Sequence, residues 1–298
     1  MLNVAKKNFS NKLSADNILI SVKNAYEKFQ NKEAVFLDIR DPSQFEKSHI
    51  PNARNVNEIF TYLSTSDKKG QEELKSTFQE IFRREGITGN ENIITYEECL
   101  RSRFGASCRA YYILKLLGHP NVEVLHGGWE SWVKEGYPVS DKIEPVEKGT
   151  FEANWNEKIF ADKEEVLKAI NDPKTILLDV RDYDEWVAES SSPYGKDFTP
   201  KKGRIPGAVH LYWRDLMIER NDVTLLKDAD EIESICAQKG VTKDKNIIVY
   251  CFKGARASNT LIALKRAGFE NVKNYFASWN EWSREDSLPV DDSKVIKI

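Results

Sequence analysis

Short hydrophobic runs alternate with amphipathic stretches along most of this chain. The runs at 36–37 and 247–249 are typical of buried strands. Residues 257–267 carry apolar side chains at helical spacing, and Gly268 follows as a stop signal. Strands that alternate with helices indicate a parallel sheet with helices on both faces. The pattern therefore predicts an α/β fold, in which ligand sites form just after the C-terminal ends of strands.

The same short motifs occur twice in the same order, about 150 residues apart, a spacing far longer than that of solenoid repeats. We therefore predict duplicated domains at residues 1–140 and 158–298, with a polar linker at 141–157. The matched motifs are VFLDIRD at 35–41 with ILLDVRD at 176–182, IPNA at 50–53 with IPGA at 205–208, NIITY at 92–96 with NIIVY at 246–250, and WESW at 129–132 with WNEW at 279–282.

Composition matters mainly for what it excludes. With 40% hydrophobic and 31% charged residues the chain is typical of globular proteins, and a net charge of −3 gives no support for nucleic-acid binding. No apolar run approaches the roughly 18–20 residues that cross a bilayer, and no signal-peptide pattern is present, so we expect a cytoplasmic protein without a membrane partner. The four cysteines and four histidines show no metal-ligand spacing, so neither a metal nor another cofactor is predicted.

The candidate chemistry lies at Cys251, which directly follows a predicted strand. A loop of six residues, 251–256, connects this strand to a helix predicted to begin near Ala257. A loop of this kind turns backbone N–H groups inward, and the helix N-terminus adds positive potential. Lys253 and Arg256 add full charges, while Gly254 supplies backbone freedom. Because all these neighbours favour a thiolate, Cys251 is a candidate nucleophile rather than a buried structural cysteine.

This loop resembles the active-site loop of the rhodanese family, and the repeated motifs extend the resemblance over nearly the whole chain. The resemblance implies an α/β fold of two rhodanese-like domains, each a parallel β-sheet flanked by helices. It also implies that Cys251 is catalytic and carries a persulfide. The substrate-binding residues that it suggests are Phe252, Lys253, Gly254, Ala255, Arg256 and Arg181.

The resemblance implies a separate role for each of several residues of the second domain. Lys253 matches the family position associated with thiosulfate, a dianion, and Arg256 is expected to pair with a substrate oxygen or a nearby carboxylate. Arg181 stands at a strand end, where it forms an ion pair or contacts the substrate, and Asp179 is expected to hold loop backbone. Glu185 departs from the family pattern, because vertebrate-type members carry an anion-binding arginine nearby.

Two further features bear on the charge and the walls of the site. Arg204 stands where many members have histidine, and it would restore some positive charge. The insert 190–203 contains three lysines and forms either a wall of the site or a solvated surface loop. The two tryptophan pairs of the repeat are expected in the cores of the domains.

The first domain carries Glu97 at the position that matches Cys251. A carboxylate cannot accept sulfane sulfur, and the segment before the next helix is about four residues longer. The resemblance therefore implies a non-catalytic domain that packs beside the active loop. Cys99 and Cys108 lie near this segment, either as packing cysteines or as regulatory thiols.

These features predict a thiosulfate sulfurtransferase that passes sulfur through a Cys251 persulfide to cyanide, a thiol or a small thiol protein. A 3-mercaptopyruvate sulfurtransferase is the alternative, although its loop typically has a small residue in place of Lys253. A family of phosphatases shares the fold but spaces its loop as C-x5-R, whereas Cys251 and Arg256 form C-x4-R. A non-enzymatic scaffold fits the first domain alone.

Overall fold

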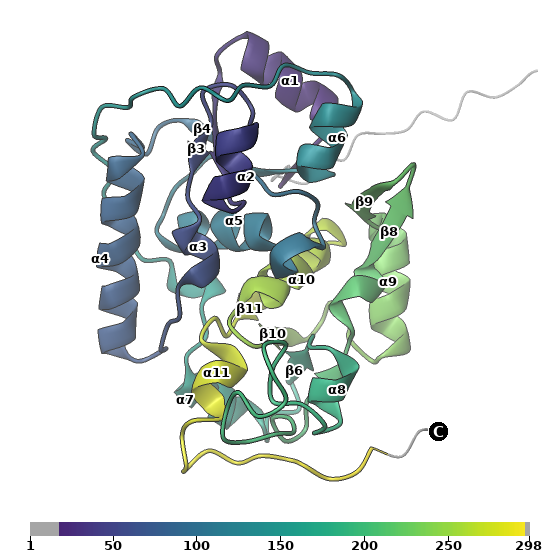
Figure 1. Cartoon of the computed structure of the whole chain (residues 1–298). Helices are drawn as coiled ribbons and strands as arrows, with labels where there is room; N and C mark the ends of the chain where they lie inside the picture. Colours follow the sequence, from purple (N-terminus) through teal and green to yellow (C-terminus); the bar gives the residue numbers. More distant parts are fainter. Residues whose placement is uncertain (1–17, 296–298) are drawn as a thin grey trace, which may run out of the picture.

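A sheet of parallel strands forms the centre of the first half of the chain in the computed structural model, which describes residues 18–295 (Figure 1). The strand order is β1-β5-β4-β2-β3, so that β4 is the central strand, with β5 and β2 on either side of it. Phe36 on β2 lies opposite Ile94 on β4, and both are buried. The strands are β1 (Leu19–Ile20), β2 (Ala34–Asp38), β3 (Arg54–Asn55), β4 (Asn92–Tyr96) and β5 (Val122–Leu125).

Helices flank this sheet and complete the core of the first half. The longest of them, α4, buries Leu74, Phe78 and Phe82, whose spacing places them on one face of the helix. The Asp67 side chain accepts a hydrogen bond from Gly70 N and caps the N-terminus of α4. The helices are α1 (Val22–Gln30), α2 (Pro42–Lys47), α3 (Glu58–Thr61), α4 (Lys68–Arg84), the 3-10 turn η1 (Ser102–Phe104), α5 (Ala106–Leu116) and α6 (Gly128–Lys134).

The second half repeats this architecture around another parallel sheet, with strand order β11-β10-β6-β7. Val249 on the inner strand β10 lies between Leu178 and Asn274 of its neighbours. An antiparallel hairpin, β8–β9, lies apart from this sheet (Figure 1). The strands are β6 (Thr175–Asp179), β7 (Val209–His210), β8 (Met217–Arg220), β9 (Val223–Leu226), β10 (Asn246–Tyr250) and β11 (Val272–Asn274).

The helix after β10 begins two residues earlier than the sequence pattern predicted. Gly254 is its N-cap, in a left-handed conformation (φ 85°), and a Cβ there would lie 2.5 Å from the ring of Phe276. Arg256 therefore belongs to the first helical turn rather than to the loop. The helices of this half are η2 (Glu157–Ile159), α7 (Lys163–Ala169), α8 (Tyr183–Trp186), η3 (Trp213–Leu216), α9 (Ala229–Gln238), α10 (Ala255–Arg266) and α11 (Ser278–Trp282).

Helices α5 and α10 pack against each other at the junction of the two halves (Figure 1). The Asn259 side chain donates to Leu100 O at 3.4 Å, and the rings of Tyr112 and Phe276 stack at 5.3 Å. The segment 141–156 contains neither helix nor strand, and its backbone is hydrogen-bonded to the first half. The predicted α/β fold with two parallel sheets is confirmed.

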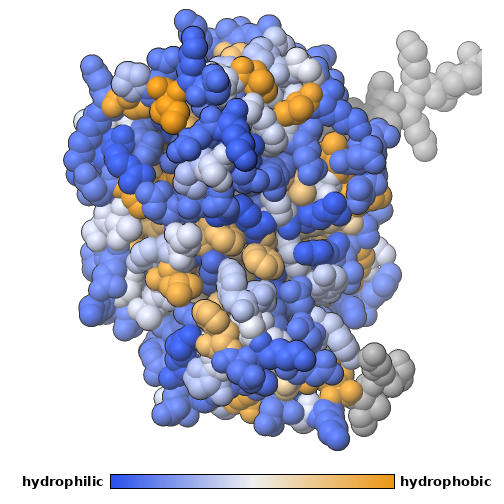
Figure 2. Space-filling view, in the orientation of Figure 1, coloured by the Kyte–Doolittle hydropathy of each residue, from blue (hydrophilic) through white to orange (hydrophobic). Residues whose placement is uncertain are grey.

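The surface in Figure 2 is largely hydrophilic, with smaller hydrophobic areas scattered between charged side chains. Within residues 18–295 no helix is both long and apolar enough to cross a membrane.

Candidate active site

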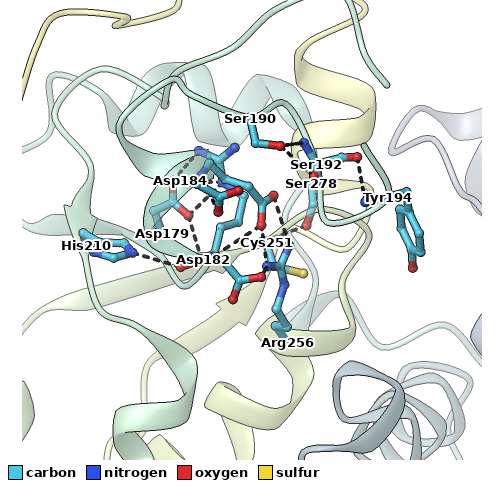
Figure 3. Close-up of polar contacts among 12 residues, drawn as sticks. Asp179, Asp182, Asp184, Ser190, Ser192, Tyr194, His210, Cys251, Arg256 and Ser278 are labelled. Atoms are coloured by element: carbon cyan, nitrogen blue, oxygen red, sulfur yellow. Dashed lines mark hydrogen bonds and ion pairs between the residues drawn. The ribbon is translucent and has the colours of Figure 1, made fainter. Parts of the chain in front are cut away.

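Cys251 stands at the C-terminal end of β10, between that strand and α10. Its backbone N–H donates to Ser278 Oγ at 3.1 Å, and its carbonyl accepts from Trp279 N. Ser278 itself adopts a left-handed conformation (φ 57°) and donates from its hydroxyl to Tyr275 O at 2.6 Å. The start of α11 therefore holds the backbone of the cysteine in place (Figure 3).

The Cys251 thiol is buried, with only 1% of the residue exposed. Its sulfur accepts a hydrogen bond from Gly254 N at 3.1 Å, so the N-terminus of α10 is directed at the thiol. The other cysteines within the described part of the chain are also free and buried. A thiolate in this position receives a backbone donor and the positive end of a twelve-residue helix.

Arg256 does not stand as a free cation beside the thiol. Its guanidinium is buried and donates to both oxygens of Glu185, at 2.5 and 3.1 Å, and it also lies 3.1 Å from Asp182 (Figure 3). Burial lowers the pKa of Arg256, but the charges of Glu185, Cys251 and Asp182 and the hydrogen bonds to Glu185 together outweigh burial, so the net pKa is raised. Of the two expected partners, the structure shows the carboxylate. Glu185, the residue that departs from the family pattern, thus balances the loop arginine.

An acidic cluster lies beside this ion pair. Asp182, Asp184 and Glu185 present carboxylate oxygens within 4.8 Å of one another. Two of the three carboxylates pair with Arg256, so the charge of the cluster is already partly balanced within the protein.

Lys253 reaches from the loop to the first half of the chain. Its ammonium donates to Phe60 O at 2.7 Å and lies 4.0 Å from the centre of the Phe60 ring. Burial and, after it, the positive charge of Arg109 lower the pKa of Lys253 to about 7, against the opposing effect of Cys251. This lysine is therefore poised to gain a proton when an anion binds beside it.

Arg109 on α5 completes the site from the first half, and the sequence reasoning missed it. The side chain is fully buried and donates to Tyr62 O at 2.6 Å. Burial lowers the pKa of Arg109 to about 10, and the charge of Cys251 acts in the opposite direction. Within the described residues, Arg109 and Lys253 donate to backbone carbonyl oxygens and not to carboxylates. The available signal was a charged residue directly before the apolar run 110–114 of α5.

Arg181 and Asp179 form a buried ion pair rather than an open cation. The guanidinium donates to both Asp179 oxygens, at 2.6–3.1 Å, and to Gly203 O at 2.6 Å. The same arrangement joins Arg40 and Asp38 in the first half of the chain, which has no counterpart of Cys251. Because the pair occurs without a nucleophile, these contacts support the structural interpretation of Arg181 over substrate binding.

The insert 190–203 carries aromatic rings against the catalytic loop. Tyr194 and Phe198 contact Phe252 at centroid distances of 5.5 and 5.8 Å. The insert therefore forms a wall of the site, one of the two interpretations that the sequence left open. Arg204 follows the insert and pairs with Asp291 at 2.8 Å, so its charge is balanced elsewhere.

Comparison with known proteins identifies the architecture. The family model of the rhodanese-like domain matches residues 21–135 and again residues 162–285. The chain belongs to the rhodanese family. The two rhodanese domains coincide with the two parallel sheets, and the tandem arrangement predicted from the internal repeat is confirmed.

Relatives that match most of the chain are named as sulfurtransferases or as a sulfur carrier protein. A Haloferax volcanii protein named "Putative thiosulfate sulfurtransferase" is 31% identical over 293 residues, covering 95% of this chain and 99% of that protein. The 3-mercaptopyruvate sulfurtransferase of Escherichia coli is 30% identical over 220 residues, covering 73% and 74%. The sulfur carrier protein TtuD of Thermus thermophilus is 28% identical over 283 residues, covering 92% and 96%. This rhodanese-family chain is a sulfurtransferase.

Solved structures agree on the fold. The crystal structure of SseA, a 3-mercaptopyruvate sulfotransferase from Escherichia coli, superposes with a TM-score of 0.73 at 25% identity, over 89% of this chain and 99% of that chain. The structure of EanB has a TM-score of 0.78 at 23% identity, over 92% of this chain and 69% of the other, and shows a likeness of fold alone.

In the first rhodanese domain, Glu97 occupies the place of the nucleophile. Its carboxylate is buried and accepts hydrogen bonds from Ala106 N, Ser107 N and Ser102 Oγ, each at 3.1 Å, and from Ser107 Oγ at 2.8 Å. Burial raises the pKa of Glu97 to about 8, and these hydrogen bonds oppose the rise. The donors that could surround a thiolate here are thus occupied by a side chain of the protein.

We predict that Glu97→Cys does not activate the first rhodanese domain. Helix α5 begins nine positions after Glu97, whereas α10 begins four positions after Cys251, so a new thiol would lack the same short cradle. In a Cys251→Ser background, turnover with thiosulfate should stay below about 1% of wild type. Cyanide-dependent thiocyanate formation measures it, and robust turnover would show that loop length does not matter.

Proposed function

We propose that this enzyme transfers sulfane sulfur from thiosulfate to a thiophilic acceptor through a persulfide on Cys251. The observation that carries the proposal is the charge of the site. Arg109 and Lys253 are buried, the charge of Cys251 acts on the pKa of both, and their hydrogen-bond partners are carbonyl oxygens rather than carboxylates. Buried cations without counter-ions attract an anion, and a dianion balances two of them better than a monoanion.

The reaction is a double displacement that needs no external oxidant or reductant. The Cys251 thiolate attacks the outer sulfur of thiosulfate, and the S–S bond breaks with its electron pair leaving on sulfite. The enzyme then holds a persulfide, whose terminal sulfur carries the negative charge. A cyanide ion or a thiolate attacks that terminal sulfur, the new S–S bond breaks, and the Cys251 thiolate is restored.

Each residue of the site has a part in this scheme. Gly254 N, which donates to the thiol at 3.1 Å, stabilises the cysteine as nucleophile and as leaving group. Arg109 and Lys253 stabilise the thiosulfate oxygens and the departing sulfite. Arg256 is held by Glu185, and we infer that it shapes the loop rather than binding the donor.

The alternative donor is 3-mercaptopyruvate, the compound that appears in the name of the Escherichia coli relative. Its carboxylate is a single negative charge that could bind the same cations. The same Cys251 persulfide would form, but a C–S bond would break and its electron pair would leave on the enolate of pyruvate. Steady-state kcat/KM for the two donors, each with cyanide as acceptor, separates them. We expect thiosulfate to have the higher value, and the opposite order would transfer the assignment to mercaptopyruvate.

Lys253→Ala should lower kcat/KM for thiosulfate by about ten- to a hundredfold, because a charge-assisted contact of roughly 1.5–3 kcal/mol is lost. The effect on mercaptopyruvate should be smaller. The effect of the lysine on the Cys251 thiolate is the same for both sulfur donors, so it cancels when the two losses of kcat/KM are compared. Equal losses for both donors would mean that Lys253 acts on Cys251 alone.

The same lysine gives a pH dependence of definite sign. An ammonium group is charged below its pKa, and the pKa of Lys253 is about 7. In the wild type, kcat/KM for thiosulfate should therefore fall as the pH rises through about 7, since kcat/KM reports ionisations of the free enzyme. Lys253→Ala should lack this descending limb, and Lys253→Arg should shift it beyond the accessible range.

A further inference from the structure

The loop that follows Glu97 is longer than its counterpart after Cys251 and has a strained backbone. Arg103, Phe104 and Gly105 adopt left-handed conformations in succession, with φ of 42°, 59° and 81°. Left-handed backbone costs a residue other than glycine about 1–2 kcal/mol. Such strain persists only where the surrounding structure holds it, and it is concentrated at functional sites.

Contacts within the first domain hold this loop in shape. The buried Glu97 carboxylate binds Ser102 at one end of the loop and Ala106 and Ser107 at the other. The Arg103 guanidinium pairs with Asp41, donates to Asn57 Oδ1 at 2.5 Å, and lies 4.1 Å from the centre of the Phe60 ring. Glu97 is thus an anchor for the loop.

The loop presents Phe104 to the active site of the other domain. The Phe104 ring lies 5.6 Å from the Arg256 guanidinium and meets the Tyr194 ring edge-on at 6.0 Å. The Lys253 ammonium lies between Phe60, at 4.0 Å, and Tyr194, at 5.0 Å. Tyr194 also contacts Phe104, Phe198 and Phe252. We call the set of rings that meets at this lysine and at Tyr194 the aromatic collar: Phe60 and Phe104 from the first domain, and Tyr194, Phe198 and Phe252 from the second.

We infer that the aromatic collar selects the sulfur acceptor by size, and that the first domain, without a nucleophile of its own, supplies the selecting ring Phe104. Cys251 is 1% exposed, whereas Tyr194 and Phe198 on the collar are 41% and 47% exposed. Phe252, which follows Cys251 in the chain, contacts both of these partly exposed rings, so the collar adjoins the buried cysteine. A small nucleophile such as cyanide passes between the rings, whereas a bulky thiol such as glutathione collides with them. The collar thus selects the acceptor by excluding the larger one. This inference rests on the proposed Cys251 persulfide.

The test measures the second half-reaction alone. The enzyme is loaded with sulfur from thiosulfate and is then mixed with cyanide, 2-mercaptoethanol or glutathione in single-turnover experiments. Phe104→Ala should raise the glutathione rate relative to the cyanide rate by about tenfold, the discrimination typical of one apolar group in a pocket. Phe104→Leu keeps most of the bulk and should raise this ratio less. 2-Mercaptoethanol should respond less than glutathione.

A gain of rate with the bulky thiol cannot arise from misfolding. An unchanged or lowered ratio of glutathione to cyanide rates in Phe104→Ala would overturn the inference. Glu97→Ala should raise the ratio as Phe104→Ala does, and the double variant should show no further gain, because both changes remove the same obstacle. Additive gains would show that Glu97 does not position Phe104.

Failure of the proposed function gives a different result. If intact-mass measurement finds no added sulfur on the wild type after thiosulfate, the donor assignment fails. Loading from mercaptopyruvate then supplies the same persulfide, and the acceptor comparison still decides the role of Phe104. If Cys251→Ser still gains sulfur, the persulfide site itself fails, and the collar inference fails with it.

Discussion

Cys251→Ser is expected to abolish sulfur transfer, with turnover falling by at least about 10⁴-fold, as when the nucleophile of a covalent mechanism is removed. Serine is nearly isosteric with cysteine, so the buried position should tolerate it and the fold should persist. Its hydroxyl cannot form a persulfide. After incubation with thiosulfate, intact-mass spectrometry should show the mass of one added sulfur atom on the wild type and none on the variant.

The control for this experiment is Cys108, another buried cysteine close to the junction of the domains. Cys108 lies on α5, and its sulfur is 3.6 Å from the Asn259 amide nitrogen. Burial, together with the charge of Glu97, raises the pKa of Cys108, which keeps it a thiol. Cys108→Ser should therefore still gain one sulfur. Loss of the added sulfur in Cys108→Ser, or its retention in Cys251→Ser, would contradict the assignment.

Arg109→Met should lower kcat/KM for thiosulfate by about 10²–10³-fold, the loss typical when a buried donor to a developing negative charge is removed. Methionine fills a similar linear space without the charge. Arg109→Lys is the matched variant, because it restores a cation in the same place, and it should recover a substantial part of the rate.

A merely structural role for Arg109 makes a different prediction. The guanidinium donates to Tyr62 O at 2.6 Å, so its removal also leaves a carbonyl without that partner, at a cost in stability of about 1–3 kcal/mol. That cost would lower the melting temperature of both variants. It would also lower kcat/KM equally for thiosulfate and for mercaptopyruvate. Under our proposal the loss should be larger for thiosulfate than for mercaptopyruvate, and Arg109→Lys should reverse it. A loss that follows the melting temperature alone would contradict the proposal.

Local patterns determined the architecture and the position of the nucleophile. The repeated motifs predicted two α/β domains, and the placement of Cys251 after a buried strand predicted its position at the end of β10. These properties are encoded by neighbouring residues, because strand and helix periodicity and turn residues act over a few positions. For the same reason the sequence also located Glu97 at the matching place in the first domain.

Tertiary structure alone decided which charges remain free at the site and which rings surround it. The sequence left Arg256 to pair with either a substrate oxygen or a carboxylate, and it predicted Arg204 as added positive charge at the site. Folding brings Glu185 to Arg256 and Asp291 to Arg204. Arg109 and Phe104 have no motif, because their roles depend on the packing of α5 against α10 and on the strained loop before α5. Contacts between residues far apart in the chain leave no local period, so only the folded pair of domains shows them.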